Sequence, residues 1–260
     1  MSEKFLSGKI VLVTGSTSGI GLGIAKCLAQ SGADIVLNGF GEHIQAVHDI
    51  QSMGVKALFH GADMRKPSEI QDLVDTVEKS WGPVDVLVNN AGIQHVSSIE
   101  DLPTEKWDDV IAINLSSSFH TTRLVLPGMI QKNWGRIINI ASVHGLVASV
   151  NKSAYVAAKH GLVGLTKVTA LETATTGITC NAICPGWVLT PLVQHQVDAK
   201  AKAMNISIED ATKQLLSEKE PSMQFTTPEE LGALAIFLCS TAGNNVRGVA
   251  WNMDGGWAAQ

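Results

Sequence analysis

The chain has 260 residues, of which 45% are hydrophobic and 17% are charged, and its formal net charge is −5. This length and composition suit one α/β domain over residues 1–260 with a single large core. The negative charge and the lack of a basic run argue against a nucleic-acid partner. The first residues lack the apolar region of a signal peptide, and the apolar stretch 231–239 is too short to cross a bilayer. We therefore expect a cytoplasmic protein with no membrane partner.

The cysteines and histidines show no metal-binding pattern. The four cysteines lie in apolar segments and form no C-x-x-C pair, and the eight histidines include no H-E-x-x-H motif. We expect the cysteines to be buried free thiols. We predict no catalytic zinc and assign no metal ligand.

Short apolar runs, each of a length that suits one buried strand, recur along the chain. They are residues 9–15, 35–38, 56–60, 84–89, 136–140, 178–184 and 249–253. Longer amphipathic segments separate them, and strands that alternate with helices indicate a parallel sheet covered on both faces. We predict a doubly wound α/β domain whose parallel sheet has seven strands, one for each run.

One long segment, between Trp187 and Phe225, interrupts this alternation. Ser207 begins a helix in its second half with a box-like start, and Thr227 with the following proline and acids begins the next helix. Because the segment follows a strand end, a helical lid over roughly residues 187–225 is one interpretation. A helical insertion on the surface is the other.

Three glycines at the first strand–helix junction indicate a nucleotide site. Gly15, Gly19 and Gly21 form the pattern G-x-x-x-G-x-G. Glycines let the backbone approach a pyrophosphate, which then lies at the positive N-terminus of the helix. The pattern alone is weak, since any tight turn favours glycine, but its position in the first unit of the sheet strengthens it.

The end of the second strand favours NAD over NADP. Residues 38–41 contain no acid for the adenosine ribose, but neither they nor residues 16–18 contain an arginine or lysine for a 2′-phosphate. An unpaired phosphate dianion would be costly, so NAD is the expected cofactor. Asp63, after the third strand, could bond the adenine amine or merely cap a turn.

The chain carries a candidate proton-transfer group at Tyr155, its only tyrosine, with Lys159 four residues later. Side chains four apart on a helix share a face, so the phenol and the ammonium can converge. A free phenol has a pKa near ~10, and a nearby cation favours the phenolate. Ser142 ends an apolar run and can hydrogen-bond a substrate oxygen. The three residues suit a carbonyl–alcohol pair, although a Tyr–Lys pair of this spacing also occurs in ordinary helices.

Together these motifs resemble the short-chain dehydrogenase/reductase family over nearly the whole chain. The matching residues are Thr14-Gly-Ser-Thr-Ser-Gly-Ile-Gly21, Asn89-Asn-Ala-Gly92, Asn114, Ser142, Tyr155-x-x-x-Lys159 and Pro185-Gly186. The resemblance implies a seven-stranded Rossmann-like domain, hydride transfer to or from a nicotinamide, and a homotetramer.

The resemblance also implies the role of each catalytic residue. Tyr155 is the acid/base, Lys159 holds the nicotinamide ribose and lowers the pKa of the tyrosine, Ser142 orients the substrate oxygen, and Asn114 keeps a water for the proton path. The residues that it places around the cofactor are Gly15, Thr17, Ser18, Gly19, Ile20, Gly21, Phe40, Asp63, Asn90, Ala91, Gly92, Tyr155, Lys159, Pro185, Gly186, Val188 and Thr190.

Within the family, the stretches 91–95, 142–148, 151–155, 183–187 and 254–257 resemble the members that oxidise D-3-hydroxybutyrate to acetoacetate. By this resemblance the substrate carboxylate is held by Gln94, His144, Lys152 and Gln196, while Trp187 and Trp257 wall the pocket. Leu189 stands where these members tend to have arginine.

The positions of these residues support a small anionic substrate without the resemblance. Gln94 and His144 follow the fourth and fifth predicted strands, and Lys152 lies just before the helix of Tyr155. In an open parallel sheet, ligands bind at the carboxyl ends of the strands. Hydrogen-bond donors and a cation on different loops around one opening suit a carboxylate. Each residue alone has a simpler reading, such as a turn cap or a solvated lysine.

Two alternatives remain open at this point. One is a 3-oxoacyl-thioester reductase of the same family, which would use NADPH and a basic patch for an acidic carrier protein. The other is a nucleotide-sensing protein without turnover, although a pure sensor need not keep the Ser142, Tyr155 and Lys159 set. The apolar helical segments 104–131 and 153–175 are candidates for subunit pairing.

Overall fold

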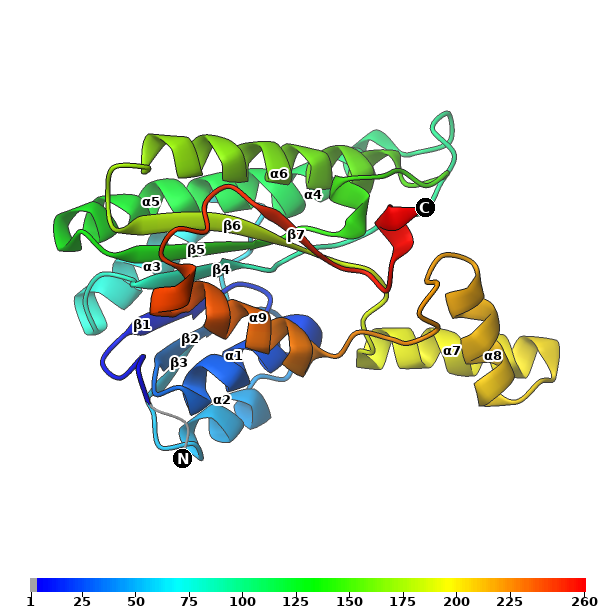
Figure 1. The fold of residues 1–260 in the computed structure, drawn as a ribbon, viewed down its shortest axis with the longest axis horizontal. Coiled ribbons are helices and arrows are strands. Elements are labelled where there is room, and N and C mark those ends of the chain that lie inside the picture. Colours follow the sequence, from blue (N-terminus) through cyan, green and yellow to red (C-terminus); the bar gives the residue numbers. More distant parts are fainter. Residues whose placement is uncertain (1–3) are drawn as a thin grey trace.

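The computed structural model describes residues 4–260 and contains one seven-stranded parallel sheet (Figure 1). The strand order is β3-β2-β1-β4-β5-β6-β7. The strands are β1 (Ile10–Val13), β2 (Asp34–Asn38), β3 (Ala57–His60), β4 (Val86–Asn89), β5 (Gly135–Ile140), β6 (Ile178–Pro185) and β7 (Ala250–Met253). Each lies within one or two residues of a predicted apolar run, so the predicted sheet is confirmed.

The central strands are buried on both faces, which explains their continuous apolar sequences. Successive side chains of a strand point to opposite faces. Val11 and Val13 of β1 therefore belong to one core layer, with Ile24 and Leu28 of the first helix, while Leu12 belongs to the other.

Helices form the outer layers on both faces of the sheet (Figure 1). α1, α2 and α9 cover one face, and α3 to α6 cover the other. The helices are α1 (Gly19–Gln30), α2 (Ile44–Gln51), α3 (Pro67–Ser80), α4 (Thr104–Ile111), α5 (Ser117–Lys132), α6 (Ser153–Glu172), α7 (Pro191–Met204), α8 (Ile208–Ser217) and α9 (Pro228–Cys239). None of the helices in the described part of the chain is long and apolar enough to span a membrane.

The chain order reverses at β1, which pairs with β2 on one side and β4 on the other. The connections after β1 and β4 run in opposite directions along the sheet. They therefore leave a crevice at the carboxyl ends of these strands, where ligands bind in such sheets.

The segment between β6 and α9 folds into α7 and α8, which stand away from the sheet beside its carboxyl end (Figure 1). Both predicted helix starts are present here. The Ser207 side chain accepts a hydrogen bond from Asp210 N, and Thr227 and Glu230 form a reciprocal capping box. Three cysteines are buried as expected, Cys27 is half-buried, and all four are free thiols.

Candidate active site

The carboxyl ends of the central strands open into a cavity of about 940 Å³. It gathers residues from strand ends, from α6, from α7 and from the C-terminal turn. The predicted site residues that line it are Gly15, Ser18, Gly19, Ile20, Asn90, Ala91, Gly92, Gln94, Ser142, His144, Lys152, Tyr155, Lys159, Pro185, Gly186, Trp187, Val188, Thr190, Gln196 and Trp257.

Five predicted residues do not line this cavity: Thr17, Gly21, Phe40, Asp63 and Asn114. Gly21 and Asn114 lie behind its wall and shape it. The lining residues that were not predicted are all apolar: Ile93, Val96, Ile140, Ala141, Val143, Pro191, Leu192 and Val193. All of them lie within three positions of a predicted site residue in the sequence, and this proximity is the one signal that could have identified them.

The turn after β1 is packed too closely to admit a side chain at two of its glycines, Gly15 and Gly21. A Cβ on Gly21 would lie 2.4 Å from the Gly15 oxygen, and Gly15 has φ +61° with the Ala91 backbone against it. Asn90 fixes the neighbouring loop, because its Nδ2 donates to the oxygens of Thr14 (2.9 Å) and Gly15 (2.8 Å). The turn thus brings backbone close to the cavity floor.

The N-terminus of α1 is suited to an anion. Its N-cap residue, Ser18, makes no side-chain capping bond, and its first turn contains no acid. The backbone N–H groups at the start of a helix, together with the helix dipole, favour a negative charge such as a pyrophosphate. The close-packed glycine turn and this helix end therefore fit the phosphates of a dinucleotide.

The end of β2 is occupied by a structural asparagine. Asn38 Nδ2 donates to the oxygens of His60 and Ala62, both at 3.0 Å, and its Oδ1 accepts from Gly15 N at 3.3 Å. All its polar atoms serve the fold. Phe40 follows with a 64% exposed ring, and its oxygen accepts a bond from Thr17 Oγ1.

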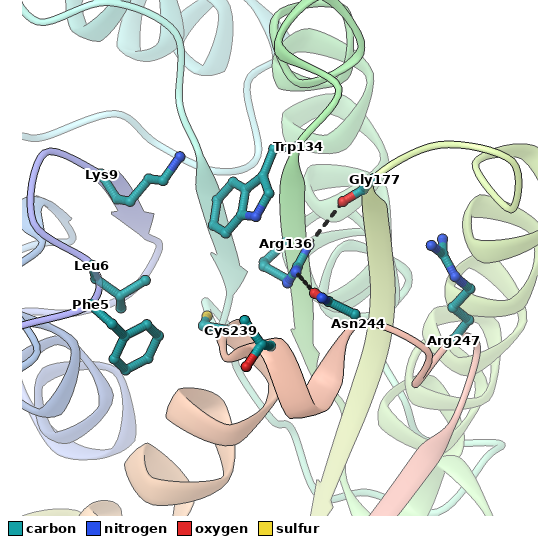
Figure 2. Close-up of a pocket in the computed structure, with 10 residues that line it drawn as sticks. Phe5, Leu6, Lys9, Trp134, Arg136, Gly177, Cys239, Asn244 and Arg247 are labelled. Atoms are coloured by element: carbon teal, nitrogen blue, oxygen red, sulfur yellow. Dashed lines mark hydrogen bonds between the residues drawn. The ribbon is translucent and has the colours of Figure 1, made fainter. Parts of the chain in front are cut away.

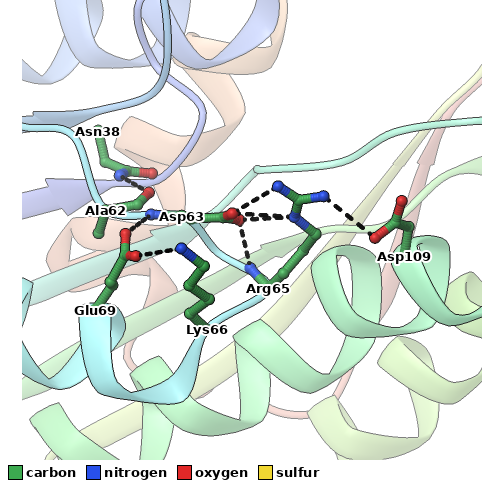
Figure 3. A network of polar contacts seen from close by, with 7 residues as sticks. All are labelled: Asn38, Ala62, Asp63, Arg65, Lys66, Glu69 and Asp109. Carbon is green, nitrogen blue, oxygen red and sulfur yellow. Dashed lines mark hydrogen bonds and ion pairs between the residues drawn. The ribbon is translucent and has the colours of Figure 1, made fainter.

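Asp63 is held by a neighbouring arginine (Figure 3). Arg65 Nη2 lies 2.7 Å from Asp63 Oδ2, and Arg65 Nε lies 3.0 Å from both carboxylate oxygens. The hydrogen bond from Arg65 holds the pKa of Asp63 below its usual value. Arg65 also reaches Asp109 of α4 at 3.4 Å. Of the two predicted roles, the structure shows the turn role, since Asp63 Oδ1 accepts from Arg65 N at 2.9 Å.

Tyr155 lies on the first turn of α6 and faces the cavity beside Ser142. Burial raises the pKa of the Tyr155 phenol, and interaction with the Ser142 hydroxyl partly offsets this rise. The phenol is therefore protonated at neutral pH. This differs from the expectation that the lysine would already have lowered its pKa.

Lys159 lies one helical turn further along α6, on the same face as Tyr155. Its Nζ is 5.6 Å from the centroid of the phenol ring and donates to the oxygen of Ile140 at 2.8 Å. Burial lowers the pKa of Lys159 to about 8. The ammonium thus lies at the cavity wall, but its hydrogen bond is to the end of β5 and not to the phenol.

Asn114 lies in a π-helical turn, η1 (Ala112–Ser116), which joins α4 to α5. Its Oδ1 accepts from Ile93 N and its Nδ2 donates to the Ile93 oxygen, both at 2.9 Å. The extra residue in a π-turn re-aims a side chain without breaking the helix. Asn114 thereby fixes the loop after β4, close to Gly92 and Lys159 Nζ.

His144 is buried in the wall, and both its ring nitrogens have protein partners. Nδ1 is 3.4 Å from Ser142 Oγ, and Nε2 is 3.0 Å from Ser149 Oγ. Burial lowers the pKa of His144 to about 4, so the ring is neutral at physiological pH. Its ring also contacts Tyr155 and Trp257 edge to face, with centroids 5.9 and 5.2 Å apart. Ser149 is a contact that the sequence did not suggest.

The cavity is cationic. Its wall contains Lys152 and Lys159 but none of its lining residues, all within 4–260, is acidic. Lys152 takes part in none of the ion pairs of the described residues. Burial lowers the pKa of Lys152, which reflects a partly desolvated ammonium without a protein counter-ion. Such a cation favours an anionic ligand.

A second cavity, of about 430 Å³, lies at the amino ends of the strands (Figure 2). Its two arginines donate to backbone carbonyls, and its lysine, Lys9, pairs with Asp85. Arg136 donates to the oxygens of Gly135 (2.8 Å) and Gly177 (2.9 Å), and Arg247 donates to the Thr176 oxygen (2.9 Å). Cations near carbonyl ends of helices and loops stabilise the fold. No predicted site residue lines this cavity.

Residues 9–201 match the family of short chain dehydrogenases, and the chain belongs to that family. It is 65% identical to a D-beta-hydroxybutyrate dehydrogenase of Cupriavidus necator, over 98% of this chain and all of that protein. It is 52% identical to the enzyme of the same name from Rhizobium meliloti, over 97% and 99% of the two chains. The fold is similar to that of an actinorhodin polyketide ketoreductase with NADPH, with TM-score 0.90 and 37% identity over the full length of both chains.

Proposed function

We propose that the protein is an NAD-dependent D-3-hydroxybutyrate dehydrogenase, which interconverts (R)-3-hydroxybutyrate and acetoacetate. The observation that carries this proposal is the cavity, in which Ser142 and Tyr155 share the opening with the unpaired Lys152 and no acid. The identity of 65% and 52% to two enzymes with this named activity supports it.

The residues of the nucleotide end would hold NAD by its phosphates. The N-terminus of α1 and the glycine turn at Gly15 would receive the pyrophosphate, with Asn90, Gly92 and Thr190 along the cavity. Phe40 and Asp63 would lie on the adenosine side. When bound, NAD⁺ supplies the acceptor for the hydride from C3 of the substrate.

The other end of the cavity would bind and orient the acid. Lys152, Gln94, His144 and Gln196 would hold the carboxylate, between the walls formed by Trp187 and Trp257. For His144 to do so, its Nε2 would have to give up its hydrogen bond with Ser149 Oγ and bond the substrate carboxylate instead. Holding C3 in one place contributes to catalysis through positioning, up to roughly 7–11 kcal/mol in ideal cases. Closure of α7 and α8 as a lid would exclude water.

The phenol of Tyr155 would exchange the proton of the substrate hydroxyl, which Ser142 orients. The buried Lys159 ammonium, close to the phenol, would favour the phenolate once it swings from the Ile140 oxygen. Asn114 would support the proton path behind the loop after β4. Oxidation releases a proton, so alkaline conditions favour that direction.

We further propose that the enzyme works in the cytoplasm as a homotetramer, with neither a nucleic-acid nor a membrane partner. The support for subunit pairing is apolar surface on α5 and α6. Phe119 and Ile130 of α5 are 48% and 53% exposed, and Val168 and Leu171 of α6 are 52% and 77% exposed.

The test is the absorbance of the reduced nicotinamide after acetoacetate is added. We expect NADH to be consumed, with NADPH at least about 100-fold less effective because residues 16–18 and 38–41 offer no cation for its 2′-phosphate. Preference for NADPH and a 3-oxoacyl thioester would instead indicate the reductase alternative. Binding of NADH without consumption would indicate a sensor.

A further inference from the structure

The chain contains a buried carboxyl group beside the cavity that the proposed mechanism does not use. Glu220 follows α8 and is 1% exposed. Its Oε1 accepts a hydrogen bond from the backbone N of Trp187, and its buried Oε2 has no partner in the described residues. A buried carboxyl group is costly unless its surroundings or a proton compensate it.

Glu220 differs in this respect from the other buried acids. Asp63 pairs with Arg65, Asp85 pairs with two lysines, and Asp254 accepts from the N–H groups of Gly256 and Ala258. Among residues 4–260, Glu220 is therefore the buried acid with neither a cation nor a full set of donors. Its position needs a reason other than charge pairing.

The carboxyl group of Glu220 lies where three segments meet. A Cβ on Gly186 would lie 2.2 Å from Oε1, and a Cβ on Gly255 would lie 3.4 Å from Oε2. Both glycines adjoin the cavity wall, since Gly186 precedes Trp187 and Gly255 lies two residues before Trp257. One side chain thus packs on both strand-end segments that carry the tryptophans.

Further contacts tie the segment of Glu220 to the C-terminal turn. Ser222 N donates to the Gly255 oxygen at 3.0 Å, and Gln260 Nε2 donates to the Lys219 oxygen at 3.2 Å. The turn carries Trp257, whose ring contacts that of His144. A displacement of Glu220 would therefore shift Trp187 and Trp257, which form the pocket walls, and His144, which is predicted to bind the substrate carboxylate.

We propose that Glu220 is a positioning residue of the substrate pocket, whose buried carboxyl group joins the base of the α7–α8 segment to both tryptophan-bearing walls in a pH-dependent way. It does not touch the reacting atoms. It acts through Trp187 and Trp257. The proposal rests on the proposed function only for the identity of the substrate.

The pH dependence follows from the surroundings of the carboxyl group. Burial raises the pKa of Glu220 to about 7, the Trp187 N–H partly opposes this, and the charge of Asp254 adds to the rise. Asp254 on the C-terminal turn is the charged group that acts on this carboxyl group, and the Gly186–Trp187 segment brings no charge. Lys219 precedes Glu220 in the chain. Below this pKa, the Glu220 carboxyl group is neutral and holds the Trp187 and Trp257 segments together. Above it, the carboxylate is a buried anion that faces Asp254, and the contact between these segments loosens.

The test compares the wild type with Glu220→Gln and Glu220→Ala, using Glu218→Ala as a matched control. Gln keeps the shape and the acceptor for Trp187 N but stays neutral. Glu218, two residues earlier, is exposed and pairs with Lys200. We expect Glu220→Ala to raise the KM for 3-hydroxybutyrate about tenfold, with kcat changed less than about threefold and the KM for NAD⁺ unchanged.

To test the pH dependence, the KM for 3-hydroxybutyrate is measured against pH in the wild type and in Glu220→Gln, and the ratio of the two values is taken. Groups that titrate in both enzymes cancel from this ratio. We expect this ratio to rise from about 1 near pH 6 to about threefold or more near pH 8. A flat ratio, or a Glu220→Ala enzyme that behaves like Glu218→Ala, would overturn the proposal.

Limited trypsin digestion gives a readout that does not depend on turnover. α7 and α8 carry Lys202 and Lys213, neither of which pairs with Glu218. We expect cleavage there to be faster in Glu220→Ala than in Glu218→Ala. We also expect the cleavage rate of the wild type, divided by that of Glu220→Gln at the same pH, to be higher near pH 8 than near pH 6. Equal cleavage rates would count against the inference even if the enzyme turned over as proposed. A failure of turnover with altered cleavage would count against the proposed function alone.

Discussion

The substitution Tyr155→Phe is expected to lower kcat by about 10²–10⁴-fold while NADH still binds. It removes the hydroxyl that we propose exchanges a proton with the substrate, and it leaves the ring in place. The ring packs beside Ala154 and Ala158 of α6 and against His144, so the fold should tolerate the change. Steady-state turnover and NADH fluorescence titration measure the two effects separately.

His160→Gln is the matched control for Tyr155→Phe. His160 lies on the same helix, five residues later, but is exposed and bonds only the Val156 oxygen. It should keep wild-type turnover. If Tyr155→Phe also kept it, the phenol would have no part in the mechanism.

The substitution Lys152→Met is expected to raise the KM for 3-hydroxybutyrate about 10- to 100-fold. Methionine keeps an unbranched apolar stem but removes the ammonium, which has no protein counter-ion in the described structure. The effect should be confined to anionic substrates. With an uncharged ketone of similar size, the KM should change by less than about threefold.

Lys213→Met provides the control for a lost surface charge. Lys213 lies on α8 and pairs with Glu209 four residues earlier, where both side chains are exposed. A solvent-exposed pair of this kind contributes little, and its loss should leave both KM values unchanged. Equal effects of Lys152→Met on the acid and on the ketone would contradict the carboxylate assignment.

The sheet and the first nucleotide turn could be predicted because their causes are local in sequence. Strands buried on both faces are largely apolar, as in β1, whose four residues are all apolar and all buried. The glycines of the first turn are required by close packing, as at Gly21, where a Cβ would meet the Gly15 oxygen. Tyr155 and Lys159 share a face because of helical periodicity alone.

The electrostatic state of the site depends on distant contacts and could not be predicted. Lys159 Nζ bonds the oxygen of Ile140, nineteen residues earlier, at the end of β5. Burial raises the pKa of the Tyr155 phenol, whereas the spacing alone suggested a lowered pKa. Helical periodicity places the two groups together but does not determine which other atoms compete for the ammonium.

Glu220 and Asp63 show two further limits. Glu220 meets Trp187 across thirty-three residues, and nothing in the intervening sequence marks it as buried. For Asp63, a local signal was available, since Arg65 follows two residues later and takes up its carboxylate. Asn114 was predicted by resemblance, but nothing in the sequence pattern predicted the π-turn that carries it.

The proposal that this cavity oxidises a short hydroxy acid is tested most directly by isotope transfer. The enzyme would be incubated with NAD⁺ and (R)-3-hydroxybutyrate deuterated at C3, and the products examined by mass spectrometry. We predict that the deuterium appears in the reduced nicotinamide as acetoacetate forms in equal amount. Deuterium that stayed on the acid, or that was lost to water, would contradict it.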